Sequence, residues 1–418
     1  MLSQLLAAVL KILIIIILVN TMLIYGSSIS QSSDVSIVSA TVFNQQEEPD
    51  FRPYLPSTCD RVVGRGQLCE RRQTRTEDGY LLALHRVHSP GLDYGPPVLF
   101  IHGLLSASDQ WLLYGRDHDL ASILADKGYD VWLGDLRGNA YSRRHVTLSP
   151  EQPEFWDFSF HEHGYYDIPA MIDHIRLATG HKRVFYVGYS LGGTVFFVAC
   201  SSRPAVNEKI RAGVVIAPYM FTPVHLNKVL QLTIRIIFSV MRQWRTLRVF
   251  EVFPRSNATL AINQLFCEPK SRLMPLCLQL YDHVFGLTQE LNENLLLDVM
   301  STFRAGSSAK TLYHCAQVMY SNSLKYYDYE PEENLKRYGQ TEPPDYDLSR
   351  VTAPVSLHYS LQDWFVNAEN VDKLAERLPH LIGKFVVPSQ SFNHIDFMVG
   401  KHARELVYDE IFNIISKF

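Results

Sequence analysis

Short apolar segments alternate with helix-like segments along most of the chain. The apolar segments are rich in valine, isoleucine, leucine and aromatic residues. Segments of this kind are typical of buried strands, and their alternation with helices favours a mostly parallel sheet that helices cover. The sequence therefore predicts an α/β fold with strands at Val98–Ile101, Tyr129–Leu133, Val184–Val187, Ala212–Ile216, Val355–Tyr359 and Phe385–Val387.

Three helical segments lie between the predicted strands. Asp119 is placed to cap the first segment, which Gly128 ends. Asp167 and Pro169 open the second, which Gly180 closes. The third, Thr194–Ser201, directly follows a strand and a short turn.

The alternation lapses in one long block, residues 221–347. Helical, aromatic-rich sequence punctuated by proline replaces it there. Ligands of open α/β sheets bind at the carboxyl edge of the strands, so we expect this block to be a mainly helical cap or lid over that edge. The core is then split into residues 53–220 and residues 348–418.

Composition and charge narrow the class of protein. The 418 residues include 39 basic and 43 acidic side chains, which gives a formal charge of −4. Because no sustained basic run could neutralise a phosphate backbone, nucleic acid is not an expected partner. A hydrophobic content of 47% with 20% charged residues excludes a disordered or collagen-like chain.

The amino-terminal segment has the layout of a signal peptide. Lys11 precedes an apolar run from Ile12 to Val19, and small polar residues follow Tyr25. We expect a signal peptide at residues 1–28 and a polar linker at residues 29–52. An uncleaved anchor, with the catalytic domain on the lumenal side, is the alternative, because apolar residues on both sides lengthen the run.

A signal peptide predicts a secreted or lysosomal protein. Asn257-Ala-Thr259 is then a usable acceptor for N-glycosylation.

The strongest chemical signal is the segment Gly188-Tyr189-Ser190-Leu191-Gly192. It is a G-x-S-x-G motif that follows a predicted strand and precedes a predicted helix, which is the context the motif requires. The sharp turn between the two elements strains the serine backbone and exposes its hydroxyl at the sheet edge. We expect Ser190 to be a nucleophile.

A serine hydroxyl attacks only when a base removes its proton and a third group orients that base. The motif predicts the order serine, acid, histidine along the chain. Asp363 follows the strand Val355–Tyr359, and His394 follows the strand Phe385–Val387. Asp396 is the rival acid, although two residues after His394 it is better placed as a helix cap.

Hydrolysis through serine also needs backbone N–H groups that hold the developing oxyanion. Leu191, directly after the nucleophile, supplies the first. The second comes from the loop after the strand Val98–Ile101, where His102 and Gly103 precede Leu104. We expect the N–H of Leu104 to be that donor.

Several motifs resemble the acid lipase family of α/β-hydrolases, which includes the gastric, lysosomal and related insect lipases. They extend over nearly all of the chain after the linker, in a specific order and spacing. They are Thr76–Tyr80, His102–Leu105, Leu136–His145, Phe155–Phe160, Tyr166–Ala170, the segment around Ser190, Asp363-Trp364 and Asn393–Phe397.

The resemblance implies a triad of Ser190, Asp363 and His394, with the oxyanion held by Leu104 and Leu191. It implies no metal and no organic cofactor. The expected substrates are lipid esters at a lipid–water interface. Two positions depart from the family, which has histidine and glutamine where this chain has Tyr189 and Leu191.

The six cysteines are too few for a disulfide scaffold. Cys267 and Cys277 resemble the disulfide of the family's cap. Cys59 with Cys69 is a second candidate pair, and Cys200 is expected to be a buried thiol.

Two segments of the predicted cap allow two interpretations each. The apolar stretch from Val229 to Met241, with Arg242, Trp244, Arg245 and Arg248 after it, is either a lid helix that meets lipid or a helix that packs on the core. The aromatic cluster Tyr326–Tyr329 either lines an acyl pocket or packs internally.

Together these features predict a serine hydrolase that cleaves carboxyl esters of lipids, either acylglycerols or sterol esters. Two alternatives stay open. One is a catalytically silent lipid-binding protein on the same fold, since a fold does not dictate a function. The other is an esterase for small soluble esters.

Overall fold

The computed structural model describes residues 55–218, 239, 241–244 and 246–418. The predicted signal peptide, the polar linker and most of the apolar segment from Val229 to Met241 lie outside the described residues.

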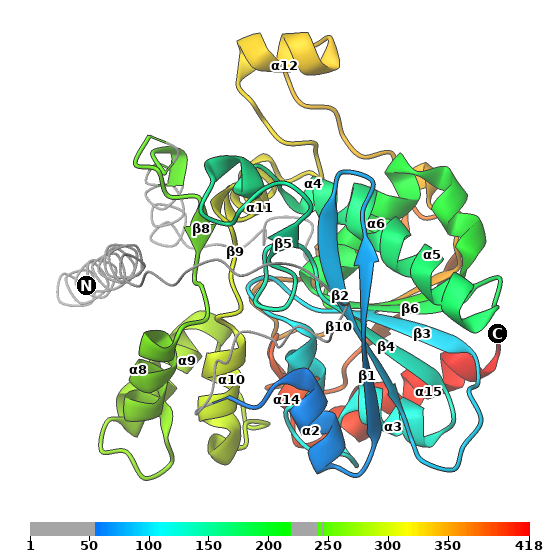
Figure 1. The fold of residues 1–418 in the computed structure, drawn as a ribbon, viewed down its shortest axis with the longest axis vertical. Coiled ribbons are helices and arrows are strands. Elements are labelled where there is room, and N and C mark those ends of the chain that lie inside the picture. Colours follow the sequence, from blue (N-terminus) through cyan, green and yellow to red (C-terminus); the bar gives the residue numbers. More distant parts are fainter. Residues whose placement is uncertain (1–54, 219–238, 240, 245) are drawn as a thin grey trace, which may run out of the picture.

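A nine-stranded sheet forms the centre of the molecule (Figure 1). Its strand order is β1-β2-β4-β3-β6-β7-β10-β11, and the short strand β5 pairs with β2. The pairs from β4 to β11 are parallel, whereas β2 runs antiparallel to β1, β4 and β5. The strands are β1 (Leu68–Arg75), β2 (Tyr80–His88), β3 (Pro97–Ile101), β4 (Asp130–Gly134), β5 (Arg144–His145), β6 (Val184–Tyr189), β7 (Ile210–Ile216), β10 (Val355–Tyr359) and β11 (Leu381–Val386).

Helices cover both faces of the sheet, as Figure 1 shows. Helices α5 (Ile168–Thr179) and α6 (Leu191–Ser202) lie on one face, and α3 (Leu120–Asp126) and α15 (Asp409–Ser416) lie on the other. Every residue of β3, β4, β6 and β10 is buried. These strands are therefore the apolar framework that fixes the loops at their carboxyl ends.

The predicted α/β fold is confirmed, and each predicted strand overlaps an observed one. The strand expected at Phe385–Val387 is longer and begins earlier, at Leu381. Strands β1, β2 and β5 were not predicted. The sequence of β1 is mostly polar and the strand is half exposed at the sheet edge, so it carries no apolar signal.

The predicted start of the helix at Asp167 and its end at Gly180 are confirmed, as is the N-cap position of Asp119, but neither aspartate caps its helix with its side chain. Asp119 occupies the N-cap position of α3, but its carboxylate accepts the N–H groups of Tyr114 and Gly115 and binds Arg65. Asp167 precedes α5, and its carboxylate binds the buried Arg137 instead. The third predicted helix begins at Leu191 rather than Thr194.

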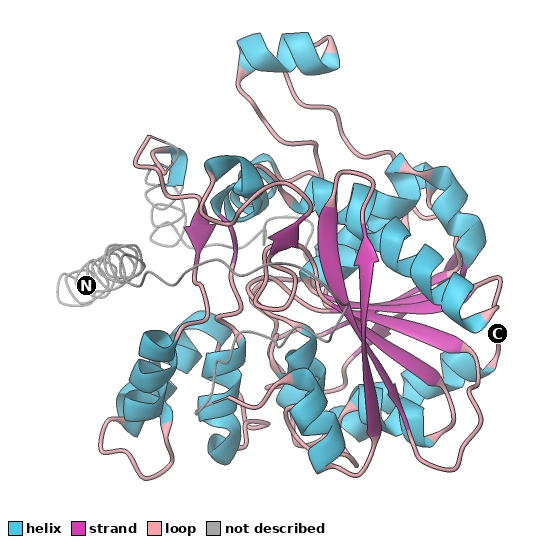
Figure 2. Cartoon of the chain, in the orientation of Figure 1, coloured by secondary structure: helices cyan, strands magenta, loops and turns pink. Residues whose placement is uncertain are grey.

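The block between β7 and β10 is mainly helical in its described part (Figure 2). Its helices are α8 (Asn257–Cys267), α9 (Met274–Phe285), α10 (Leu296–Thr302), α11 (Ala309–Ser321) and α12 (Pro331–Tyr338). A two-stranded ribbon of β8 (Glu251–Val252) and β9 (Ser307–Ser308) was not expected. We call the described part of this block the insertion; its exact boundaries stay a prediction.

Two disulfides join neighbouring elements. Cys59 of α2 (Thr58–Gly64) is bonded to Cys69 of β1, and Cys267 of α8 to Cys277 of α9. Both candidate pairs therefore form in the structure. Cys200 is a buried free thiol, as expected, and burial raises its pKa.

None of the described helices is long and apolar enough to cross a membrane. Over the same residues, no group of three or more histidine, cysteine, aspartate or glutamate side chains could hold a metal ion.

Candidate active site

Ser190 lies at a sharp turn between β6 and α6. Its backbone has φ 52° and ψ −115°, a conformation that residues other than glycine rarely adopt. The turn brings chain segments very close together, since a Cβ atom on Gly188 would lie 2.5 Å from the carbonyl oxygen of Gly192. The two glycines of the motif are therefore required by packing, and the serine hydroxyl is held at the carboxyl edge of the sheet.

His394 joins Ser190 to Asp363 by two hydrogen bonds. Its Nε2 lies 3.0 Å from Ser190 Oγ, and its Nδ1 lies 2.7 Å from Asp363 Oδ2. The serine and histidine are each less than one tenth exposed. The structure thus brings together three side chains that the sequence places after β6, β10 and β11.

The Asp363 carboxylate is held in place by its own loop. Its Oδ1 accepts the backbone N–H groups of Phe365 at 2.7 Å and Val366 at 3.2 Å. These two bonds occupy one oxygen and turn the other toward His394. An imidazole with this neighbour keeps its Nδ1 protonated and its Nε2 free to accept the serine proton.

Asp396, the rival acid, neither contacts His394 nor caps a helix end with its side chain. It is the first residue of helix α14 (Asp396–Val399), whose N-cap is Ile395. Its Oδ2 accepts the N–H of Asn393 at 2.7 Å and the hydroxyl of Thr288 at 2.6 Å. Burial raises the pKa of this carboxyl to about 7, because the two hydrogen bonds offset only part of the lost hydration. The predicted capping role is therefore wrong; the carboxyl instead links the histidine loop to the insertion.

The loop after β3 is fixed by buried hydrogen bonds. His102 Nε2 accepts the N–H of Leu136 at 3.1 Å, so its Nδ1 carries the proton and donates to the carbonyl of Gly103 at 2.8 Å. Burial lowers the pKa of His102, which keeps this imidazole neutral. The N–H of Gly103 donates to Gln110 Oε1 at 3.1 Å. This network sets the backbone that leads into Leu104.

Leu191 is the first residue of α6. The N–H groups in the first turn of a helix have no partner within the helix, so the N–H of Leu191 is available at the serine. Its side chain is buried. The replacement of the family's glutamine therefore changes a packed side chain and leaves the backbone donor in place.

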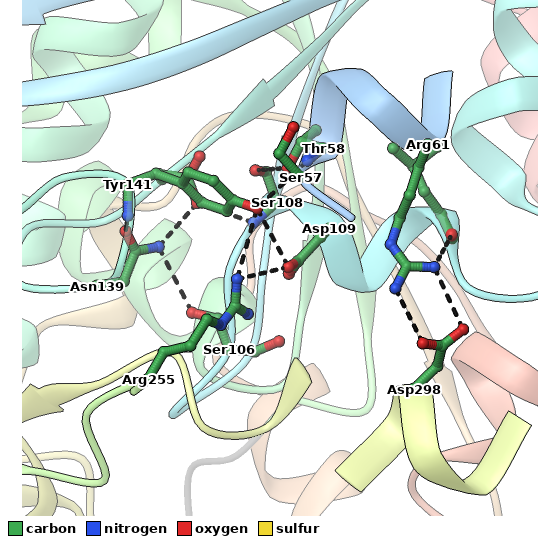
Figure 3. Close-up of polar contacts among 12 residues, drawn as sticks. Ser57, Thr58, Arg61, Ser106, Ser108, Asp109, Asn139, Tyr141, Arg255 and Asp298 are labelled. Atoms are coloured by element: carbon green, nitrogen blue, oxygen red, sulfur yellow. Dashed lines mark hydrogen bonds and ion pairs between the residues drawn. The ribbon is translucent and has the colours of Figure 1, made fainter. Parts of the chain in front are cut away.

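Polar contacts join the insertion to the core next to the loop that holds Leu104 (Figure 3). Arg255, which precedes α8, forms an ion pair with Asp109 at 2.8 Å, and both side chains are buried. Asp109 belongs to a short helix, Ser108–Leu112, just after the Leu104 loop, and it also accepts the hydroxyl of Tyr141 at 3.3 Å. Sequence reasoning did not predict these contacts, since no spacing or motif pairs the residues.

In the aromatic cluster Tyr326–Tyr329, one tyrosine packs internally and two line a cavity. Tyr326 stacks on Tyr346 with ring centroids 4.2 Å apart. Tyr327 and Tyr329 line a cavity of about 830 Å³ between α11, α12 and the segment around Trp156. None of Ser190, Asp363 and His394 lines this cavity, so the described structure gives no support to the acyl-pocket interpretation.

Comparison with known proteins places the chain in a family. A family model described as alpha/beta hydrolase fold matches residues 96–401, and one described as a partial alpha/beta-hydrolase lipase region matches residues 62–115. Lipase 1 of Drosophila melanogaster is 32% identical over 91% of this chain and 85% of its own length. Human gastric triacylglycerol lipase is 32% identical over 83% of this chain and 88% of its own length.

A solved structure agrees on the fold. A putative lipase from Sulfolobus solfataricus superposes with a TM-score of 0.56 at 13% identity, covering 88% of this chain and 97% of that one. These two sequence relatives align with 91% and 83% of this chain. The chain therefore belongs to the α/β-hydrolase fold family, among the gastric-type lipases that its motifs resemble.

Proposed function

We propose that the protein is a serine hydrolase that cleaves carboxyl esters of lipids, acylglycerols first among them. The observation that carries the proposal is the continuous hydrogen-bonded chain from Ser190 through His394 to Asp363. The named relatives, a gastric triacylglycerol lipase among them, support a lipid ester as substrate.

The reaction proceeds through an acyl-enzyme. His394 Nε2 takes the proton of Ser190 as Oγ attacks the ester carbonyl carbon, and Asp363 stabilises the imidazolium that forms. The tetrahedral intermediate collapses, His394 gives the proton to the leaving alcohol, and the acyl group stays on Ser190. Water then attacks this acyl-enzyme with His394 again as the base, which releases the carboxylic acid and restores the serine.

The N–H groups of Leu104 and Leu191 hold the oxyanion in both steps. Because both donors are backbone groups on fixed elements, they need no rearrangement when the charge develops. A single donor of this kind contributes about 10² to 10³ in kcat.

An ester panel tests this function. Emulsified long-chain triacylglycerols, sterol esters and dissolved short-chain esters are assayed from pH 4 to 8, with Ser190→Ala as the control. We expect the highest rates on emulsified acylglycerols and a loss of about a millionfold in kcat for the control. Preference for dissolved esters points to a soluble-ester esterase, and inactivity on every ester despite lipid binding points to a silent carrier.

We also propose that the protein enters the secretory pathway and is secreted or lysosomal. The two disulfides are compatible with an oxidising compartment, and Asn257 is exposed at the first turn of α8. A mass shift that a glycosidase removes, and that is absent in Asn257→Gln, supports entry into the secretory pathway. A protein that stays associated with membranes after carbonate extraction indicates the uncleaved anchor instead.

A further inference from the structure

Tyr189 is one of the two departures from the family pattern. It precedes the turn at Ser190 and contacts both the Leu104 loop and the His394 loop. It is the last residue of β6, directly before Ser190, and it is 1% exposed. Its ring contacts the Leu104 loop so closely that a Cβ atom on Gly103 would lie 3.1 Å from it. Its ring centroid lies 5.0 Å from that of His394.

The hydroxyl of Tyr189 reaches the backbone of the histidine loop. It donates a hydrogen bond of 2.9 Å to the carbonyl oxygen of His394, 205 residues further along the chain. Burial and the nearby Asp363 carboxylate raise the pKa of Tyr189 well above its usual value. The hydroxyl therefore stays protonated and donates over the whole working pH range.

We propose that Tyr189 is a positioning residue that fixes His394 relative to the serine by holding the carbonyl of the histidine. The inference rests on the proposed function, because it assigns His394 the role of the base. The hydroxyl of Tyr189 acts through the main chain of His394, because it donates to the carbonyl oxygen of that residue.

The geometry explains why such a tether matters. His394 is carried by a loop between β11 and α14, whereas Ser190 is carried by the turn after β6. The strand pairs between β6 and β11 leave two further strands between these loops. Proton transfer needs the two atoms at hydrogen-bond distance, and a displacement of about 1 Å can cost a hundredfold in rate. The hydrogen bond from Tyr189, at the end of β6, to the His394 carbonyl restricts movement of the histidine loop relative to Ser190.

Tyr189→Phe tests the tether, because it removes only the hydroxyl. We expect kcat on a dissolved ester to fall about tenfold, with KM unchanged within twofold, since the substrate does not touch the phenol. The rate of Ser190 labelling by a fluorophosphonate falls by the same factor. The low-field proton resonance of the His394–Asp363 hydrogen bond broadens as the imidazole gains freedom.

Tyr80→Phe is the matched control. Tyr80 of β2 is also buried and also donates to a backbone carbonyl, that of Phe155. The ring contacts of Tyr80 are with residues outside the histidine loop. We expect kcat within twofold of the parent and a sharp low-field resonance. Incorporation of 3-fluorotyrosine at position 189, which keeps the donor, restores at least half of the parent kcat.

A double-mutant cycle separates this proposal from the proposed function. In a His394→Ala background, Tyr189→Phe causes no further loss, because the group that it positions is gone. A further tenfold loss in that background, or an unchanged kcat in Tyr189→Phe alone, contradicts the positioning role while leaving the hydrolase function intact. A Tyr189→Phe protein that no longer folds also contradicts it, since the hydroxyl is then a requirement of the fold.

Discussion

The sheet core and the insertion are held in different ways. In the core, the buried strands β6 and β10 carry Ser190 and Asp363 at their carboxyl ends, and His394 follows the partly exposed edge strand β11. Backbone N–H groups hold the Asp363 loop. The insertion packs on this core through apolar side chains that include Tyr281, Leu296 and Val299. It adds buried polar contacts, among them the ion pair of Arg255 with Asp109 and the hydrogen bond of Thr288 to Asp396. The comparison predicts that the chemistry depends on the geometry of the core, whereas the insertion is held by apolar packing together with a few buried polar contacts.

The largest expected effect lies in the core. His394→Ala leaves Ser190 without a base, and we expect kcat to fall about as far as in Ser190→Ala, by about a millionfold. Combining the two changes should add almost nothing, because the residues act as one unit. Single-turnover kinetics measure both losses. Additive losses would mean that the serine and the histidine act independently.

The next effect lies at the buried contact between insertion and core. Arg255→Leu leaves the Asp109 carboxylate buried without its cation, which should cost about 3 to 5 kcal/mol of unfolding free energy. Arg61→Leu is the comparison, because its partner Asp298 is 35% exposed and can be hydrated; we expect about 1 kcal/mol there. Urea unfolding measures both. Equal losses would show that burial of the acid does not decide the cost.

We expect Asp396 to make the stability of the fold depend on pH. Its pKa is about 7 in the fold against 3.8 for the free group, so the fold binds this proton more tightly than the unfolded chain does. The resulting stability is complete below about pH 4 and is lost as the pH rises through 7. A shift of this size corresponds to at most about 4 kcal/mol. Glu290 and Asp363, the nearby carboxylates, add to the shift.

Asp396→Asn should flatten this part of the stability profile, because the amide oxygen still accepts from Thr288 and Asn393 without titrating. Asp117→Asn, at an exposed position, serves as the control. Urea unfolding at pH 4, 5.5 and 7 measures the profile. An unchanged slope between pH 4 and 7 in Asp396→Asn would show that another group is responsible.

The smallest effect lies within the insertion. Replacing Cys267 and Cys277 by serine opens a short loop, and we expect a loss of about 2 to 3 kcal/mol with kcat on dissolved esters nearly unchanged. Thermal unfolding and a soluble-ester assay measure the two quantities. A large loss of kcat would link the α8–α9 hairpin to the triad and weaken the contrast between core and insertion.

The sequence predicts the parts of the structure whose signals are local. Buried parallel strands appear as apolar runs, and the turn around Ser190 is a short motif with its own glycines. Asp363 and His394 follow from their positions after later strands, although their contact spans 31 residues.

The other contacts could not be predicted, because the same residue type fits several roles at these positions or because the partner lies far away in the sequence. Asp119, Asp167 and Asp396 all stand near helix starts, where aspartate usually caps, yet each carboxylate holds a neighbouring loop or side chain instead. The arginine partner of Asp167 lies 30 residues away, and no periodicity points to it. Strand β1 is too polar to be recognised as part of a sheet.

Labelling with a fluorophosphonate, followed by peptide mass spectrometry, tests the central claim most directly. We predict one adduct, on the peptide that contains Ser190, formed rapidly in the parent protein and very slowly in His394→Ala. Ester hydrolysis should be lost in proportion to labelling. An unlabelled Ser190 in a protein that still hydrolyses esters would contradict the role of Ser190 as the nucleophile.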